Sequence, residues 1–519
     1  MKLNVLTSVA AALALVNANG ANAAVMPMAM PQAGLDLSNF LDQVEVIEDD
    51  IESLTSLVNS SELQSLITKD ALYARAEKLY ELAGHSNKSF GHPTRVIGSS
   101  GHWSTIGYIK HELKKLDGYY NVTIQPFKAF MSEVFHFDAT VDGVKPDSLV
   151  PMDMSPSTPH KKPVEGTLVL VKNNGCVDDD YSELPHDGLQ GNIALIKRGE
   201  CPFGDKAQMA AKYGASAAII YNNEKGEIRG TLGVPPEGVD VAPCVGISKD
   251  DGDAIVAKLN NDEKLSAMVM VDSFVGPITT VNVIAETNHG DPDNIVMLGA
   301  HSDSVAAGPG INDDGSGTIS LLEVATQLTK YKVKNKVRFA FWAAEEEGLL
   351  GSNYYAENLT PGENEKIRLF MDYDMMASPN YEYEVYDANN VDNPRGSEEL
   401  KNLYIDYYTS RGFNYTLIPF DGCSDYVGFI EHGIPGGGVA AGAEKDNAAN
   451  GDVLDKCYHQ LCDDLSNIAW DAFLVNTQLI AHSVATYGAD LSEFPERDVK
   501  AANAEMMTTF PYRGDKLIL

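Results

Sequence analysis

Short apolar runs alternate with segments of helical periodicity along the second half of the chain. Three runs, at 294–299, 337–343 and 367–374, are dominated by large apolar residues, and each gives way abruptly to acidic residues or histidine. Between the first two runs, residues 318–328 repeat apolar side chains with the spacing of an amphipathic helix. The alternation predicts an α/β fold in which helices cover a mostly parallel, mixed sheet.

The region before this alternation has a helical pattern. Residues 61–83 predict one helix, and a second amphipathic helix follows, for which Ser104 or Thr105 is the expected N-cap. Residues 121–127 then predict a strand. The apolar face of the second helix would consist of Ile106, Ile109, Leu113 and Leu116.

The pattern changes between residues 140 and 277. A Pro-rich start precedes short strand-like runs and one helical segment, so we expect a small α/β module inserted into the main domain. The main domain would then comprise 61–139 and 278–490, followed by a polar tail at 491–519. The expected elements of the insert are strands at 166–171, 192–197 and 217–221 and a helix at 203–213.

The N-terminus has the features of an export signal. Lys2, an apolar run from Val5 to Val16 and the sequence Ala21-Asn22-Ala23 predict a signal peptide at 1–23. Residues 24–60 are expected to be a propeptide or a solvated helical arm. Secretion is the expected fate, with vacuolar delivery as an alternative. Five glycosylation sequons agree with export, at Asn59, Asn87, Asn121, Asn358 and Asn414.

Composition excludes several classes of protein. With 44% hydrophobic and 22% charged residues over 519 positions, the chain resembles globular proteins of more than one domain. A net charge of −35 leaves no cationic surface for nucleic acid. No apolar run after the signal reaches the roughly 20 residues of a membrane span. We expect a monomer with no nucleic-acid or membrane partner.

Six cysteines are too few for a disulfide scaffold. Cys457 and Cys462 could close a local loop, and Cys176 and Cys201 a second one. Cys244 and Cys423 remain, either bridged across domains or free and buried.

Residues with metal-binding chemistry follow the predicted strands. The first run leads to His301 and Asp303, and a Gly-rich loop then brings Asp313 and Asp314 to the start of the 318–328 helix. The other runs lead to three consecutive glutamates, 345–347, and to Asp372 and Asp374. A fourth stretch, 456–463, places Tyr458 and His459 between two cysteines. Strand ends of one sheet share an edge, so these groups are expected to form a site for two divalent ions, and the His and carboxylate ligands suit zinc.

The four motifs, in this order and spacing, resemble the secreted co-catalytic di-zinc aminopeptidases of the leucine-preferring and aminopeptidase Y-like kind. The resemblance extends over about residues 60 to 490 and implies the zinc exopeptidase fold, two Zn²⁺ per chain and peptide substrates with a free N-terminus. The insert, with 193–206 and 214–223, resembles the protease-associated (PA) domain.

The resemblance also implies residue roles. His301 and Asp374 would bind one zinc, Glu346 and His459 the other, and Asp313 would bridge them. Asp303 matches the acid that orients a ligand histidine, Glu345 the general base and Tyr458 the oxyanion donor. Glu347, Asp314 and Asp372 receive no metal role, and we interpret the two aspartates as structural.

Two further positions bear on specificity. By resemblance, Met375 would line an apolar pocket for a Leu-like first residue, although ordinary core packing explains it equally well. Cys423 stands where the family often has Arg, in a segment that resembles a substrate-facing loop, and a Cys244–Cys423 bridge is one hypothesis for it.

Other functions fit the sequence less well. A zinc carboxypeptidase would need a cationic group near the motifs, and none is evident. A glutaminyl cyclase would use one zinc, whereas five ligand positions are filled here. A PA-domain receptor without catalysis would show broken ligand positions, and none is broken.

Overall fold

The computed structural model describes residues 56–498, except 117, 183, 185–187, 227, 229, 235–237, 262 and 389–392. The predicted signal peptide, residues 24–55 of the predicted arm and residues 499–519 of the tail lie outside the described residues. No helix within the described part of the chain is long and apolar enough to cross a membrane.

The main domain is built on a mixed sheet with strand order β12-β11-β13-β10-β8-β9-β7, and β1 pairs with β7. Strands β9, β8, β10 and β13 are parallel to one another, whereas β11 runs antiparallel to β13, and β7 to β9. This confirms the expected fold class. The strands are β8 Asp291–His301, β9 Asn335–Trp342, β10 Ile367–Tyr373, β11 Glu384–Asp387, β12 Thr416–Pro419 and β13 Gly436–Ala440.

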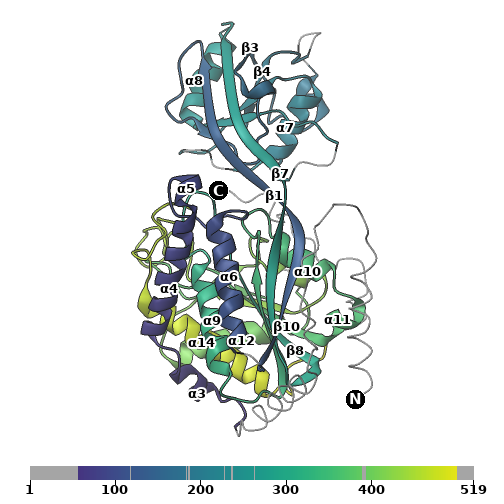
Figure 1. The fold of residues 1–519 in the computed structure, drawn as a ribbon. Helices are drawn as coiled ribbons and strands as arrows, with labels where there is room; N and C mark the ends of the chain where they lie inside the picture. The colour runs from purple at the N-terminus through teal and green to yellow at the C-terminus, as the bar shows by residue number, and fades with distance from the viewer. Residues whose placement is uncertain are drawn as a thin grey trace, which may run out of the picture. The chain divides into compact units, whose positions relative to one another are not determined.

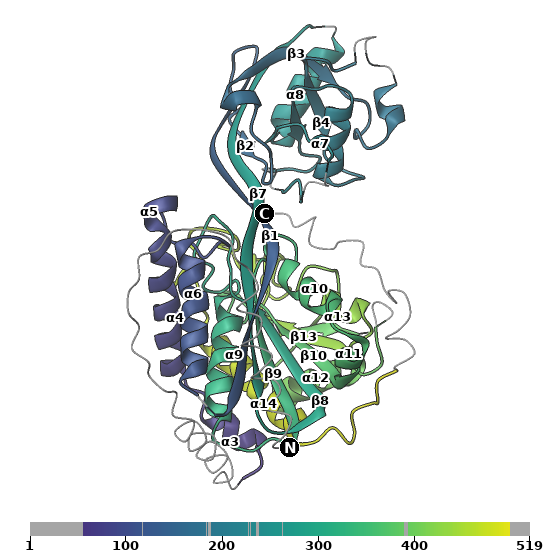
Figure 2. The same cartoon turned by 45° about the vertical axis from the view of Figure 1, so that its right-hand side comes forward.

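Helices cover both faces of this sheet (Figure 2). The larger apolar core lies between the strands and α3 Ser60–Ser65, α4 Lys69–Ala83, α6 Ser100–Lys114, α9 Gly315–Leu328, α12 Ser397–Ser410 and α14 Trp470–Ala489. The opposite face carries α10 Leu350–Glu357, α11 Pro361–Lys366 and α13 Val427–Glu431. The central strands are therefore buried on both sides, which explains why they read as continuous apolar runs.

The first helices differ from their prediction in two details. The pattern at 61–83 forms two helices, because residues 66–68 interrupt it and Thr68 caps α4 through a bond from the Ala71 N–H. The expected N-cap at Ser104 or Thr105 is wrong. Ser99 caps α6 by accepting a bond from the His102 N–H, so the helix starts about one and a half turns earlier. Ile106, Ile109 and Leu113 are buried as expected, whereas Leu116 lies beyond the end of the helix and is half-buried.

Two long strands, β1 Tyr120–Val141 and β7 Ser266–Thr287, connect the main domain to the insert (Figure 1). They pair antiparallel over almost their whole length, with a bulge between Val134 and His136. One end of β7 pairs with β9 in the main sheet, and the other end pairs with β3 of the insert.

The insert has its own sheet and core. Strands β3 Val164–Leu170, β4 Ile193–Lys197, β5 Ala217–Tyr221 and β6 Cys244–Ile247 are parallel, and β2 Val150–Pro151 pairs antiparallel with β6. Its helices are α7 Phe203–Lys212 and α8 Lys249–Asn260. The remaining short elements of the described residues are η1 Gly84–Ser86, α5 Asn87–Phe90, η2 Pro159–Lys161 and η3 Asp178–Tyr181.

The two predicted local bridges form, and the free and buried alternative holds for Cys244 but is wrong for Cys423. Cys176 bridges Cys201, and Cys457 bridges Cys462. The hypothesis of a Cys244–Cys423 bridge is wrong. Cys423 is exposed and unbridged, whereas Cys244 is buried in the core of the insert and its thiol donates to the Ala242 carbonyl at 3.1 Å.

Candidate metal and catalytic site

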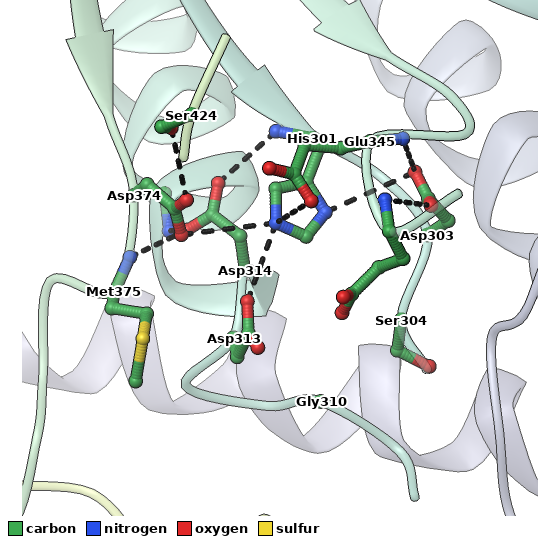
Figure 3. A network of polar contacts seen from close by, with 12 residues as sticks. His301, Asp303, Ser304, Gly310, Asp313, Asp314, Glu345, Asp374, Met375 and Ser424 are labelled. Carbon is green, nitrogen blue, oxygen red and sulfur yellow. Dashed lines mark hydrogen bonds and ion pairs between the residues drawn. The ribbon is translucent and has the colours of Figure 1, made fainter. Parts of the chain in front are cut away.

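The carboxyl ends of the parallel strands bring the predicted metal-binding residues together at one edge of the main sheet. His301 ends β8, Glu345 is the third residue after β9, and Asp374 directly follows β10. Asp313 lies just before α9, the helix that crosses beside these strand ends. Figure 3 shows the carboxylates of Asp313, Glu345 and Asp374 around the His301 ring.

His301 is surrounded by three carboxylates. Its Nε2 atom lies 3.3 Å from Asp313 Oδ1, 3.7 Å from Asp374 Oδ1 and 3.8 Å from Glu345 Oε2. The imidazole is 1% exposed, whereas the Asp374 side chain is 18% exposed. Solvent therefore reaches this half of the site from the Asp374 side.

His459 forms a second half around the same aspartate. Its Nε2 lies 3.0 Å from Asp313 Oδ2 and 3.2 Å from Glu346 Oε2. The two oxygens of Asp313 thus face two different histidines, which is the arrangement expected of a bridging carboxylate.

Several of these buried atoms lack a hydrogen bond. They include both ring nitrogens of His301 and one carboxylate oxygen each of Asp313, Glu346 and Asp374. Two groups of potential ligand atoms, each within 4.8 Å of one another, are His301 with Asp313 and Glu346, and His301 with Glu345 and Asp374. Because buried polar atoms are normally paired, unpaired oxygens and nitrogens that face a common centre fit a cation with N and O ligands.

The ionisation of the site reflects this crowding of negative charge. Burial alone would lower the pKa of His301, but Glu345 and Asp313 raise it well above its ordinary value. Burial also opposes the effect of Glu346 and Asp313 on His459, whose pKa rises to about 10. Burial raises the pKa of Asp374 to about 7. His301, His459 and Asp374 therefore hold their protons to higher pH than they would in water. A divalent cation could replace these protons as the positive charge of the site.

Asp303 contacts residues of both halves of the site. Its carboxylate accepts bonds of 3.4 Å from the backbone N–H groups of Glu345 and Glu346, one on each oxygen. The same carboxylate lies 3.8 Å from His301 Nδ1. It can therefore fix the orientation of His301 and the position of the turn that carries both glutamates.

Asp314 and Asp372 support backbone rather than the centre of the site. Asp314 caps α9 at Gly317 and also accepts bonds from the N–H groups of His301 and Met375. Asp372 accepts a bond of 3.0 Å from the Tyr426 N–H. These contacts agree with the structural interpretation of both aspartates.

The loop of His459 is held in an uncommon conformation. His459 has φ 57°, in the left-handed region, and the Cys457–Cys462 bridge closes the loop around it. Tyr458 stacks on the His459 ring with centroids 3.8 Å apart. Burial raises the pKa of Tyr458 well above its usual value, so its hydroxyl keeps its proton. A left-handed non-Gly residue costs about 1–3 kcal/mol, and the disulfide helps to maintain it here.

Comparison with known proteins identifies the family. The sequence profile of peptidase family M28 matches residues 282–484, and that of the PA domain matches residues 164–255. Aminopeptidase Y of Saccharomyces cerevisiae is 54% identical over 472 residues, which cover 89% of this chain and 87% of that protein. The chain belongs to peptidase family M28. A probable leucine aminopeptidase 2 of Aspergillus oryzae is 42% identical, over 89% of this chain and 93% of the relative.

Solved structures support the same assignment. An aminopeptidase from Aneurinibacillus sp. strain AM-1 has a TM-score of 0.70 at 28% identity and covers 88% of this chain and 100% of its own. A zinc aminopeptidase from Bacillus subtilis has a TM-score of 0.60 at 25% identity, with coverage of 80% and 96%. These findings confirm the resemblance, the fold class and the enzyme class, a hydrolase of zinc aminopeptidase type.

Sequence reasoning missed the main organiser of the site loop in this M28 peptidase, Arg95. This arginine is fully buried, and its guanidinium donates to the carbonyls of Ser302, Pro309 and Gly310. Its backbone N–H donates to Ser304 Oγ at 2.9 Å. One side chain thus fixes the whole loop between His301 and Asp313.

Asp463 is another residue that stabilises the M28 site and was not predicted from the sequence. Its two oxygens accept bonds of 2.9 and 3.0 Å from the backbone N–H groups of Asn312 and Asp313. Asn467 donates to the same carboxylate and to Asp455, which in turn binds the Asn312 side chain. The Asp313 backbone is therefore held from the loop that carries His459. The one feature of the sequence that could have indicated this role is that Asp463 directly follows Cys462 in the motif that carries His459.

Proposed function

We propose that this M28 peptidase removes N-terminal residues from peptides and proteins with two Zn²⁺ per chain. The observation that carries the proposal is the position of Asp313, whose two oxygens face His301 at 3.3 Å and His459 at 3.0 Å. Such a carboxylate can bridge two ions, and two ions can hold both oxygens of a tetrahedral intermediate.

The other ligands follow from the two halves of the site. His301 and Asp374 would bind one zinc, while Glu346 and His459 would bind the second. When bound, zinc would polarise the scissile carbonyl and lower the pKa of a coordinated water. The support is the placement of unpaired, buried N and O atoms on both sides of Asp313.

Glu345 is the proposed general base. It has a buried carboxylate beside His301, and burial raises its pKa well above the ordinary value. A carboxylate with a raised pKa is suited to take a proton from the attacking water and to return it to the leaving amine. Its neighbour Glu346 faces His459 and is the proposed metal ligand of the two glutamates.

Tyr458 is the proposed oxyanion donor, and Asp303 the positioning acid. The protonated Tyr458 hydroxyl can donate to the oxygen that gains charge, and its stacking on His459 keeps it near that ligand. Asp303 contributes through the backbone of Glu345 and Glu346 rather than through contact with the substrate.

The free α-amino group would lie beside Glu345 and Asp374, where the site is open to solvent. A preference for Leu or another apolar first residue is proposed from Met375, which follows Asp374 and is 6% exposed. The relative named above as a probable leucine aminopeptidase 2 supports this proposal. Cys423 in place of the family's Arg is expected to alter fine specificity without affecting zinc.

The test uses leucine p-nitroanilide and the same compound with its amine acetylated. We expect cleavage of the free amine alone, loss of activity on chelation and recovery at two zinc per chain. Cleavage of the acetylated compound at a similar rate would contradict the requirement for a free N-terminus.

Export, processing and assembly are further parts of the proposal. We infer secretion, with vacuolar delivery as the alternative, removal of residues 1–23 and a PA domain spanning 140–277 in a monomer. All five sequon asparagines are exposed, so each is accessible to glycosylation. N-terminal sequencing of protein from the culture medium, treatment with an endoglycosidase and light scattering would test these points. Protein retained inside the cell with Met1 intact would contradict export.

A further inference from the structure

A cavity of about 670 Å³ opens next to the proposed catalytic centre. The main domain contributes His459 and Gln460 to its wall, β1 contributes Glu133 and Phe135, and the insert contributes Asp153. The cavity thus begins at a proposed zinc ligand and continues away from it between β1 and segments of the insert.

The cavity lies on one side of the centre only. Its lining includes His459 but, among the residues the structure describes, neither Asp374 nor Met375. The proposed function places the free amine and the first side chain near Asp374 and Met375. The part of a peptide that follows the scissile bond would therefore extend toward His459 and enter the cavity.

Glu133 gives this cavity a specific chemistry. Its carboxylate is half-buried, forms no ion pair with any described residue, and burial alone raises its pKa. Asp153 adds a second acid, but burial raises its pKa against the opposing effect of Ser132, the Met154 backbone and Thr231, so this carboxyl is less readily ionised. Glu133 is thus the acid available to a ligand.

The rest of the wall suits a long side chain that ends in a positive charge. Phe135 is 54% exposed and lines the cavity together with Phe90 and Ile228. Lys and Arg side chains place their methylene groups against apolar surface and their charged end at a carboxylate. That carboxylate would be Glu133, because Lys161 of the chain itself already lies over the Phe135 ring. An acidic side chain would instead meet two carboxylates.

We infer that this cavity binds the two residues after the scissile bond and selects peptides with Lys or Arg there over peptides with Asp or Glu. The inference rests on the proposed aminopeptidase function. A charged hydrogen bond to Glu133 would raise kcat/KM for the cationic peptide by about tenfold, mainly through KM.

The test compares the zinc-loaded enzyme on Leu-X-Ala and Leu-Ala-X, where X is Lys, Gln or Glu, with leucine p-nitroanilide as the reference. We expect the order Lys, Gln, Glu at one or both positions. Glu133→Gln should bring the Lys-to-Glu ratio close to one, and Glu133→Lys should reverse it, while the reference rate stays within about twofold. Glu165→Gln, an exposed change on strand β3 of the insert and outside the cavity lining, should leave the ratio unchanged.

Equal kcat/KM for Lys and Glu peptides, or a preference that survives Glu133→Gln, would overturn the inference while leaving the proposed function intact. Failure of the zinc-loaded enzyme to cleave leucine p-nitroanilide would overturn the proposed function, and this inference with it.

Discussion

The strand ends of the main domain and the interior of the insert both bury charged side chains, but they differ in whether those charges have hydrogen-bond partners. At the strand ends, His301, His459 and several carboxylates are packed within 3–4 Å of one another, and some of their atoms lack hydrogen bonds. In the insert, Lys206 is also fully buried, but its ammonium donates to backbone carbonyls, including Gly199 at 2.7 Å.

The difference shows which region depends on a ligand. Buried charges without partners cost several kcal/mol, so the strand ends are stable only if protons or cations compensate them. The insert satisfies its buried cation from its own chain and needs no ion. We therefore expect metal removal to affect the main domain and to leave the core of the insert intact.

The largest effect expected at the strand ends is that of Glu345→Gln. Loss of the proposed general base should lower kcat on leucine p-nitroanilide by about 10²–10⁴-fold. Zinc content, measured by mass spectrometry, should remain at two per chain because Glu345 is not a proposed ligand. The matched control is Glu347→Gln, two residues away, which should retain activity within about tenfold. Equal losses in both variants would contradict the assignment of the base.

Asp303→Asn should have the next largest effect. The amide keeps the shape of the side chain but loses the charge that faces His301 Nδ1 and the N–H groups of Glu345 and Glu346. Changes of this kind cost about 10–100-fold in metal affinity or activity. Titration with a fluorescent zinc indicator would measure the affinity. Unchanged affinity together with unchanged kcat would exclude a positioning role.

The two disulfides, one in each region, allow the two regions to be tested separately. Replacing Cys457 and Cys462 by Ser releases the His459 loop, and we expect about a tenfold loss of kcat/KM with a small change in stability. Replacing Cys176 and Cys201 by Ser opens a loop of sequence separation 25 in the insert, which should cost about 3 kcal/mol of stability. This second variant should keep its leucine p-nitroanilide activity. Reversed outcomes would show that the insert, not the His459 loop, controls catalysis.

The smallest predicted effect concerns pH and the chelated protein. Burial raises the pKa of Asp463 to about 8, and neighbouring carboxylates raise that of His459 to about 10 against the effect of burial. In the unfolded chain these groups titrate near 3.9 and 6.5, respectively. Both contributions to stability are therefore present at low pH and are lost as pH rises through the folded values.

Calorimetry in the presence of chelator should accordingly show that Tm decreases as the pH rises from about 5 to 9, because the folded protein loses the stabilising protons of Asp463 and His459 over this range. Zinc should flatten the dependence by replacing the protons. A Tm of the chelated protein that rises over this range would contradict the charge balance described for the site.

Much of the site could be predicted because its residues follow strand ends. Apolar runs end where the parallel strands end, so His301, Asp313, Glu346 and Asp374 could be expected at one edge before the structure was known. Asp314 was interpreted as structural because the family motif assigns it no metal role, and the structure shows it capping α9.

The parts that could not be predicted depend on contacts between distant segments. Arg95 is 207 residues from Ser302, and Asp463 is 150 residues from Asp313, so no local pattern connects them. The length of β1 was also missed. Its expected seven residues are 22 in the structure. A bulge near Val134 breaks the alternation, and β7 is the only strand that pairs with β1 among the described residues.

The most direct test of the dinuclear site is crystallographic. Diffraction from zinc-loaded crystals on either side of the zinc absorption edge locates the metal without assumptions about ligands. We predict two anomalous peaks about 3.5–4 Å apart, one beside His301 and Asp374, the other beside Glu346 and His459, with Asp313 between them. A single peak, or two peaks that do not share Asp313, would contradict the account.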